Sequence, residues 1–210
     1  MNEQEYHIPA GFGEAVLVEK KSRFIGRVWP VADEDAAMER IAAMREQHRD
    51  ATHNVYAYSI RGGVVRCSDD GEPQGTSGMP TLNVFQSEDI HNVCCVVTRY
   101  YGGIQLGAGG LVRAYSRTAK MALDAAGTCR MRQWRMLRFP CPYALYERVQ
   151  ALAKETGAVI DEAAFAETVR LAVLVPSTLA DAFAGRVCEM SSGAVCPGGE
   201  ESVFRGVRVR

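Results

Sequence analysis

The chain has 210 residues, of which 47% are hydrophobic and 23% charged, and its formal net charge is −1. No apolar run approaches the roughly 18 residues that a membrane helix needs, and the acidic, polar N-terminus lacks the pattern of a secretory signal. A chain this close to neutral is not expected to bind nucleic acid through overall charge, so such binding would need a local patch, and we expect a cytoplasmic protein.

The first part of the chain predicts a mixed α/β domain. Residues 15–31 have the pattern of two strands around a Lys-Lys-Ser turn. Residues 33–49 predict a helix with acidic residues in its first turn and basic residues in its last. Residues 53–60 and 64–68 predict a hairpin. The expected apolar stripe of the helix comprises Met38, Ile41, Ala42 and Met44.

A polar loop and a glycine-rich stretch each lead into a further helix. After the loop "DDGEPQGTSG", a short helix is expected to begin near Pro80, because proline suits the first helical turn. Residues 92–101 predict a buried strand, and the helix after the following glycines is expected to end at Gly127. The apolar repeat of this last helix comprises Leu111, Tyr115, Thr118, Ala119 and Ala122.

The rest of the chain predicts a βαββαβ unit, which is the ferredoxin-like arrangement. The predicted strands are residues 134–141, 158–161, 167–176 and 202–209. The predicted helices are residues 143–157 and 177–189, the second of them capped by Ser177. We place the domain boundary near residue 130, which gives a first domain of residues 1–130 and a second domain of residues 131–210.

The cysteines follow no recognised pairing pattern. The seven of them make an odd count and no CxxC occurs, which argues against both a disulfide framework and a zinc ribbon. We therefore expect reduced, mostly buried thiols, and we predict neither a cofactor nor a metal centre.

Glycines are concentrated just before the last helix of the first domain. The pattern is not a P-loop, which would need lysine where Ala108 stands, nor a dinucleotide fingerprint, which would need a smaller residue at Val112. Glycines before a helix can let a negative group approach the unpaired N–H groups of its first turn. They can equally form tight turns with close helix–strand packing. The glycines are Gly102, Gly103, Gly107, Gly109 and Gly110.

Basic side chains flank this stretch. Arg99 ends the predicted buried strand next to Tyr100, and Arg113 and Arg117 fall on the helix face opposite the apolar repeat. A planar guanidinium binds two phosphate oxygens at once, so these arginines are candidates for holding a phosphate backbone. The alternative is an ordinary solvated helix face.

The acidic loop admits three interpretations. Asp69, Asp70 and Glu72 could hold Mg²⁺, could form ordinary turn hydrogen bonds, or could clamp Arg99 or Arg113 in a fixed pose, and we favour the clamp. His53, at a predicted strand start, could act as a general acid or base, but a hydrogen-bonded structural role is the stronger interpretation. The sequence assigns no catalytic residue, and an enzymatic activity is not supported.

Four motifs in this order resemble the YigZ/IMPACT family: "KKSRFIG", "HNVYAY", "SDDGEPQGTSGMP" and "VVTRYYGGIQLGAGGLVRAYS". The resemblance implies a first domain similar to the second domain of ribosomal protein S5, followed by a ferredoxin-like domain. That pairing resembles the last two domains of elongation factor G, which touch ribosome and tRNA. The resemblance also points to translational control, which the eukaryotic IMPACT proteins exert through a protein partner.

Carried over by motif, the signature positions combine the glycines and arginines above with a loop set. The loop set comprises His53, Asn54, Asp69, Asp70, Gly71, Glu72, Pro73, Gly75 and Gly78, and Tyr115 lies in the last motif. This chain departs from many relatives at Gln105, where they carry lysine, so one positive contact is absent.

We therefore expect an α+β translation-associated binding protein that contacts RNA or the ribosome through the glycine loops and arginines. It is expected to have no membrane partner and no DNA-specific motif. One alternative is a Mg-dependent enzyme of the small-molecule kinase type that binds a phosphate ligand. The other is a protein-interaction module whose acidic loop docks a basic peptide.

Overall fold

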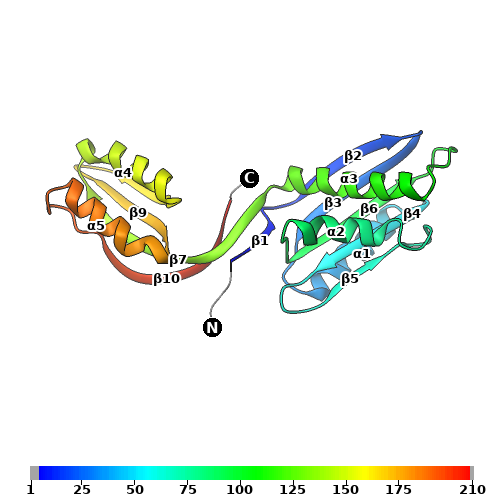
Figure 1. Cartoon of the computed structure of the whole chain (residues 1–210), viewed down its shortest axis with the longest axis horizontal. Helices are drawn as coiled ribbons and strands as arrows, with labels where there is room; N and C mark the ends of the chain where they lie inside the picture. The colour runs from blue at the N-terminus through cyan, green and yellow to red at the C-terminus, as the bar shows by residue number, and fades with distance from the viewer. Residues whose placement is uncertain (1–4, 209–210) are drawn as a thin grey trace. The chain divides into compact units, whose positions relative to one another are not determined.

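The computed structural model describes residues 5–208 and has a mixed α/β, two-domain α+β architecture, as expected (Figure 1). Its two compact units are Tyr6–Met131 with residues 206–208, and Arg132–Arg205 with Glu5. None of the helices in residues 5–208 is long and apolar enough to cross a membrane.

The first unit is built on a five-stranded antiparallel sheet in the order β2-β3-β6-β4-β5. The strands are β2 (Gly13–Glu19), β3 (Ser22–Pro30), β4 (His53–Ser59), β5 (Val65–Ser68) and β6 (Val93–Tyr100). Lys20 and Lys21 form the turn between β2 and β3, and both have a positive φ, of 45° and 65°. Two-residue hairpin turns favour that conformation because it matches the twist of the strands.

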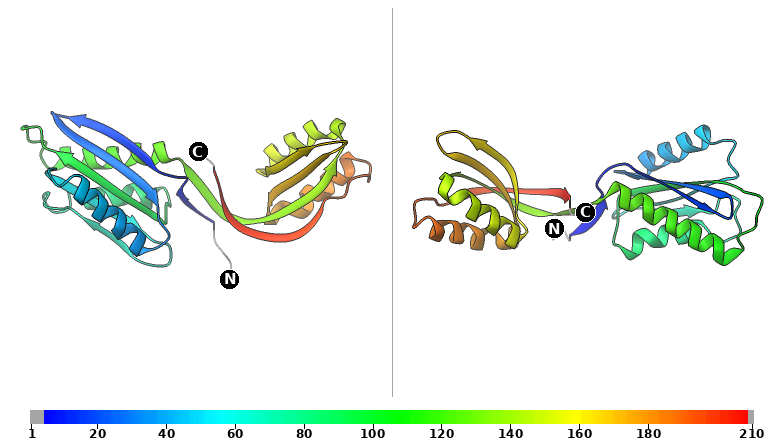
Figure 2. Two further views of the ribbon diagram at one scale, coloured as in Figure 1. Left: turned by 180° about the vertical axis from the view of Figure 1, so that it is seen from behind. Right: turned by 90° about the horizontal axis from the view of Figure 1, so that it is seen from above.

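Helices cover both faces of this sheet (Figure 2). Helix α1 (Glu34–Gln47) lies on one face, and α2 (Gly78–Ser87) and α3 (Ala108–Ala126) lie on the other. The expected apolar repeat of α3 is confirmed, since Tyr115, Ala119 and Ala122 are fully buried. Because α3 packs across β2 and β3, its first turn is held at the end of the sheet where the β2–β3 turn lies.

The apolar stripe of α1 differs from the prediction. Ala37 and Ile41 are buried, whereas Met38 is 43% exposed. Residues 37, 41 and 44 are spaced by four and three, so they share one helix face, and Met38 lies about 100° away from Ala37. The prediction of Met38 and Ala42 as core residues was therefore wrong.

The second unit confirms the βαββαβ order. Its strands lie in the order β10-β7-β9-β8, and both helices pack into one apolar core with β7 and β9. Its elements are β7 (Thr128–Cys141), α4 (Tyr143–Thr156), β8 (Val159–Phe165), β9 (Val169–Pro176), α5 (Ala180–Met190) and β10 (Gly198–Arg208). This is the ferredoxin-like topology.

Two elements depart from the expectation. Ser177 does not cap α5, because Ser177–Leu179 form a 3₁₀ turn and the α-helix begins only at Ala180. The strand β1 (Tyr6–Pro9) was not predicted, and it pairs antiparallel with the first residues of β7, from Tyr6↔Met131 to Pro9↔Thr128. Consequently β7 begins six residues earlier than its sequence pattern indicates.

Candidate functional site

The acidic loop is folded around the carboxylate of Asp69. Its Oδ1 accepts hydrogen bonds from the backbone N–H of Ser77 and Gly78 and from the Ser77 hydroxyl, and its Oδ2 accepts one from the N–H of Gly75. Burial alone would raise the pKa of Asp69, but these four hydrogen bonds outweigh it and the pKa is lowered. Asp69 thus caps α2 from outside the helix.

Substituting Asp69 with alanine should lower the free energy of unfolding at neutral pH by about 2–3 kcal/mol, because buried amide donors lose a charged acceptor. With a lowered folded-state pKa, the carboxylate stabilises the fold above its unfolded pKa of about 3.9, and this contribution is lost as the pH falls through the folded-state pKa. Urea unfolding at neutral pH and below about pH 4 should therefore show the difference between wild type and variant shrinking with acid. The exposed Glu39→Ala change on α1 is the control, with an effect within about 0.5 kcal/mol.

Asp70 ties the same loop to β4 and α1. It has a positive φ of 46°, and its Oδ2 accepts from the backbone N–H of Asn54 at 2.6 Å. Its Oδ1 pairs with Arg45 at 2.9 Å, and its backbone oxygen is 2.8 Å from His53 Nδ1. A carbonyl oxygen can only accept, so Nδ1 of His53 carries the hydrogen. Both aspartates therefore have structural partners.

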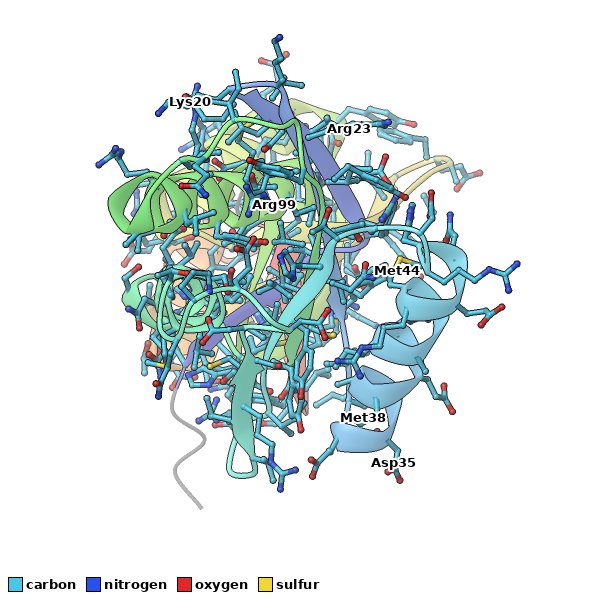
Figure 3. The ribbon with its side chains drawn as sticks, turned by 90° about the vertical axis from the view of Figure 1, so that its right-hand side faces the viewer. Lys20, Arg23, Asp35, Met38, Met44 and Arg99 are labelled. Atoms are coloured by element: carbon cyan, nitrogen blue, oxygen red, sulfur yellow. The ribbon has the colours of Figure 1, made fainter. Side chains whose placement is uncertain are left out.

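Glu72 and Arg99 form a buried ion pair beneath the loop. They are 7% and 5% exposed, and Arg99 NH1 donates to Glu72 Oε1 at 2.6 Å. The Tyr115 hydroxyl donates to the same oxygen at 2.7 Å, and burial together with the Glu72 charge raises the pKa of Tyr115. Figure 3 shows Arg99 in the interior and Lys20 at the outer edge of the unit. Arg99 is therefore no free surface cation, and the acidic loop clamps Arg99 and Arg45.

The alternatives of a Mg-dependent enzyme and of an acidic docking loop both depend on the carboxylates of this loop. Among the described side chains, no group of three or more His, Cys, Asp or Glu has the geometry to hold a metal ion. Asp69 and Asp70 already accept hydrogen bonds from the protein itself, and Glu72 is almost fully buried. The carboxylates of Asp69 and Asp70 are therefore occupied by contacts within the protein.

Several of the predicted site residues line two neighbouring hollows that share Leu106, and Arg113 and Arg117 also line a third hollow with Glu88 and Lys120. The larger, of about 450 Å³, is lined by Thr52, His53, Glu72, Pro73, Arg99, Tyr101, Gln105, Leu106, Gly107, Ala108 and Leu111. The smaller, of about 210 Å³, is lined by Leu17, Glu19, Lys20, Leu106, Gly110, Arg113, Ala114 and Arg117. The structure therefore does not bring Arg113 and Arg117 into the hollow that Arg99 lines.

The remaining predicted residues lie around these hollows. Gly103 and Gly107 have positive φ values of 82° and 75°, and Gly109 is exposed in the first turn of α3. Gly102 instead packs against the β2–β3 turn. The Tyr100 hydroxyl bonds His48 Nδ1 at 2.9 Å and lines neither hollow.

Gly71, Gly75 and Gly78 belong to the folded acidic loop. Gly71 and Gly75 have positive φ values of 88° and 75°, which only glycine adopts readily. A side chain at Gly78 would meet the backbone of Ser68. Asn54 joins the loop to β6, because its Oδ1 accepts from the Thr98 hydroxyl at 2.9 Å.

Sequence reasoning missed Lys20 as a site residue. It stands in the β2–β3 turn and lines the smaller hollow with Arg113 and Arg117. The signal was present in the sequence, because two consecutive lysines in a predicted hairpin turn place cations at the edge of the sheet.

The fold is that of a two-domain α+β protein, and its first unit contains both the buried Glu72–Arg99 ion pair and the two hollows. An Impact N-terminal domain model matches residues 20–123, and the model of a domain of unknown function, DUF1949, matches residues 140–194. The chain is 35% identical over 183 residues to the IMPACT family member YvyE of Bacillus subtilis, with 86% of this chain and 84% of that protein covered.

Two further relatives cover almost the whole chain. The IMPACT family member YigZ of Escherichia coli is 32% identical over 197 residues, which cover 91% of this chain and 96% of that protein. A crystal structure described as a hypothetical protein is 31% identical, has a TM-score of 0.58, and covers 94% of this chain and 98% of its own. The chain belongs to the IMPACT family, which confirms the resemblance.

Proposed function

We propose that the protein is a cytoplasmic, translation-associated binding protein that holds phosphate groups of RNA, either free or within the ribosome. The proposed contact is the smaller hollow of the first unit, hereafter the cationic surface, formed by Lys20, Arg113 and Arg117. The link to translation rests on the family, whose resemblance implies translational control. The RNA contact rests on the charges of this surface.

The observation that carries the proposal is that these three cations have no ion pair with any side chain in residues 5–208. Arg113 and Arg117 are four residues apart on the exposed face of α3, and Lys20 approaches from the β2–β3 turn. Glu19 is the one acidic side chain that lines the same hollow. Unpaired guanidinium groups hold phosphates without reading sequence.

Arg99 has a different part in this proposal from the one that the sequence indicated. Its guanidinium is paired with Glu72 and almost fully buried, so it is not part of the exposed surface that would meet an RNA backbone. The proposed contact surface therefore contains Lys20 and does not contain Arg99.

The double variant Arg113→Glu with Arg117→Glu should lower the affinity for RNA or ribosomes by about tenfold or more and reduce the salt dependence by close to two charges. The measurement is co-sedimentation with ribosomes and binding to unrelated RNA oligonucleotides across a salt series, with and without ribonuclease. The loss should be similar for all RNA sequences, because phosphate contacts carry no sequence information.

The matched control is Arg40→Glu with Arg49→Glu. Both arginines are exposed, and the double variant reverses the same number of charges. Arg40 lies on α1, which covers the other face of the sheet, and Arg49 lies two residues after the end of that helix. Equal losses in both double variants would mean that overall charge, not the cationic surface, governs binding. Binding by the wild type that is absent, or that does not change with salt, would contradict the proposal.

A further inference from the structure

The larger hollow, hereafter the α3 hollow, has the features of a separate ligand site. Helix α3 begins at its wall with Gly107 as N-cap, and no acidic residue occupies its first turn. No described residue accepts a hydrogen bond from the N–H groups of Ala108, Gly109 and Gly110. These amides carry the partial positive charge of a helix start, which favours a negative group.

A second, independent feature is the unsatisfied part of Arg99. Its NH1 is bound to Glu72 at 2.6 Å and its NH2 reaches Ser22 Oγ only at 3.4 Å. Its Nε is buried without any hydrogen-bond partner among residues 5–208. An unpaired buried donor is destabilising, and Arg99 lines the same hollow as Gly107 and Ala108, so a ligand oxygen there would satisfy it.

The rest of the wall suits an organic group with hydroxyls. Tyr101 is 47% exposed, and the carbon of the Arg99 guanidinium lies over its ring, 5.4 Å from the ring centroid. Glu72 Oε1 is taken by Arg99 and Tyr115, but Oε2 is 3.8 Å from His53 Nε2, too far for a hydrogen bond. Glu72 Oε2 and His53 Nε2 therefore remain available to a ligand hydroxyl.

We infer that the α3 hollow binds a small phosphate ester of the nucleoside monophosphate type. The phosphate meets the amides of Ala108, Gly109 and Gly110 and the Arg99 side chain. The base lies on the Tyr101 ring, and a sugar hydroxyl meets Glu72 or His53. The volume of about 450 Å³ falls within the range of about 300–1,000 Å³ that is usual for small-molecule sites.

The test uses two probes, inorganic phosphate and adenosine 5′-monophosphate, with the full-length chain. Both should bind by calorimetry and shift the amide resonances of residues 108–110. Ala108→Asp should lower the affinity for both probes by about tenfold or more, because a fixed carboxylate then repels the phosphate at close range. This variant should fold, since an acidic residue in the first turn stabilises a helix. Ala43→Asp, exposed on α1, is the control and should leave both affinities unchanged.

A second variant distinguishes the binding of the base from the binding of the phosphate. Tyr101→Ala should weaken adenosine 5′-monophosphate about fivefold, because stacking on the ring is lost, and should leave inorganic phosphate unaffected. No binding of either probe at millimolar concentration would overturn the inference. So would binding that Ala108→Asp leaves intact, or binding of the nucleotide that Tyr101→Ala leaves intact.

This inference does not depend on the RNA proposal. Arg113→Glu with Arg117→Glu should weaken RNA binding while preserving both probes in the α3 hollow, because neither arginine lines it. Failure of one proposal is thus distinguishable from failure of the other.

Discussion

Replacing Glu72 with alanine should lower the free energy of unfolding by about 3–5 kcal/mol, the usual cost of leaving one member of a buried ion pair alone. The Arg99 guanidinium would remain 5% exposed without a counter-charge, and the Tyr115 hydroxyl would lose its acceptor. Urea unfolding followed by circular dichroism measures the change. Substituting Asp69 or Asp70 with alanine should lower the free energy of unfolding by less than this, since both are less buried than Glu72.

Two further variants show whether the unpaired charge is the cause. Glu72→Leu combined with Arg99→Met removes both charges and should recover most of the lost stability, because apolar replacements of buried pairs are often neutral. Glu46→Ala breaks an ion pair with Arg49 in which both side chains are 81% exposed, and should change the free energy of unfolding by less than about 1 kcal/mol. A loss below about 1 kcal/mol for Glu72→Ala would mean that water reaches Arg99.

The elements that local patterns encode were predicted well. The Lys20–Lys21 turn, the α3 repeat and the βαββαβ order all follow from side-chain periodicity and from glycine at helix ends, which depend on neighbouring residues alone. Strand β1 could not be predicted this way. It is four residues long, ends in Pro9, and exists because it pairs with Thr128 about 120 residues later in the chain.

The pairings among the candidate site residues could not be predicted from the sequence. The sequence marks Glu72 and Arg99 as unusual, and a clamp between an acid and an arginine was the favoured interpretation. Which side chain meets which depends on the sheet register, where His53 on β4 lies directly opposite Arg99 on β6. Arg99 is buried because β6 is the central strand with helices over both faces. The absence of polar alternation in "VCCVVTRY" predicts a buried strand, but it does not show which acid would neutralise the arginine near its end.

The second large effect concerns Gly102, which a phosphate loop would leave open but which the structure packs tightly. A side chain there would overlap the carbonyl group of Lys21 and the nitrogen of Ser22, both of them backbone. Gly102 also donates its N–H to Ser22 Oγ at 3.2 Å, the hydroxyl that Arg99 NH2 approaches. Gly102→Ala should therefore lower the free energy of unfolding by about 3 kcal/mol, because the β2–β3 turn must shift to admit a methyl group.

Gly109→Ala, in the same segment, should instead raise the free energy of unfolding. The added methyl group would approach only the flexible end of Arg113, at 3.5 Å, and alanine favours a helix, so stability should rise by up to about 1 kcal/mol. Urea unfolding of both variants compares one glycine required by packing with one that packing leaves free. If Gly102→Ala were as mild as Gly109→Ala, the contact between the glycine loop and the β2–β3 turn would be loose. Lys20 would then not be held beside Arg113, and the cationic surface would lose its geometric basis.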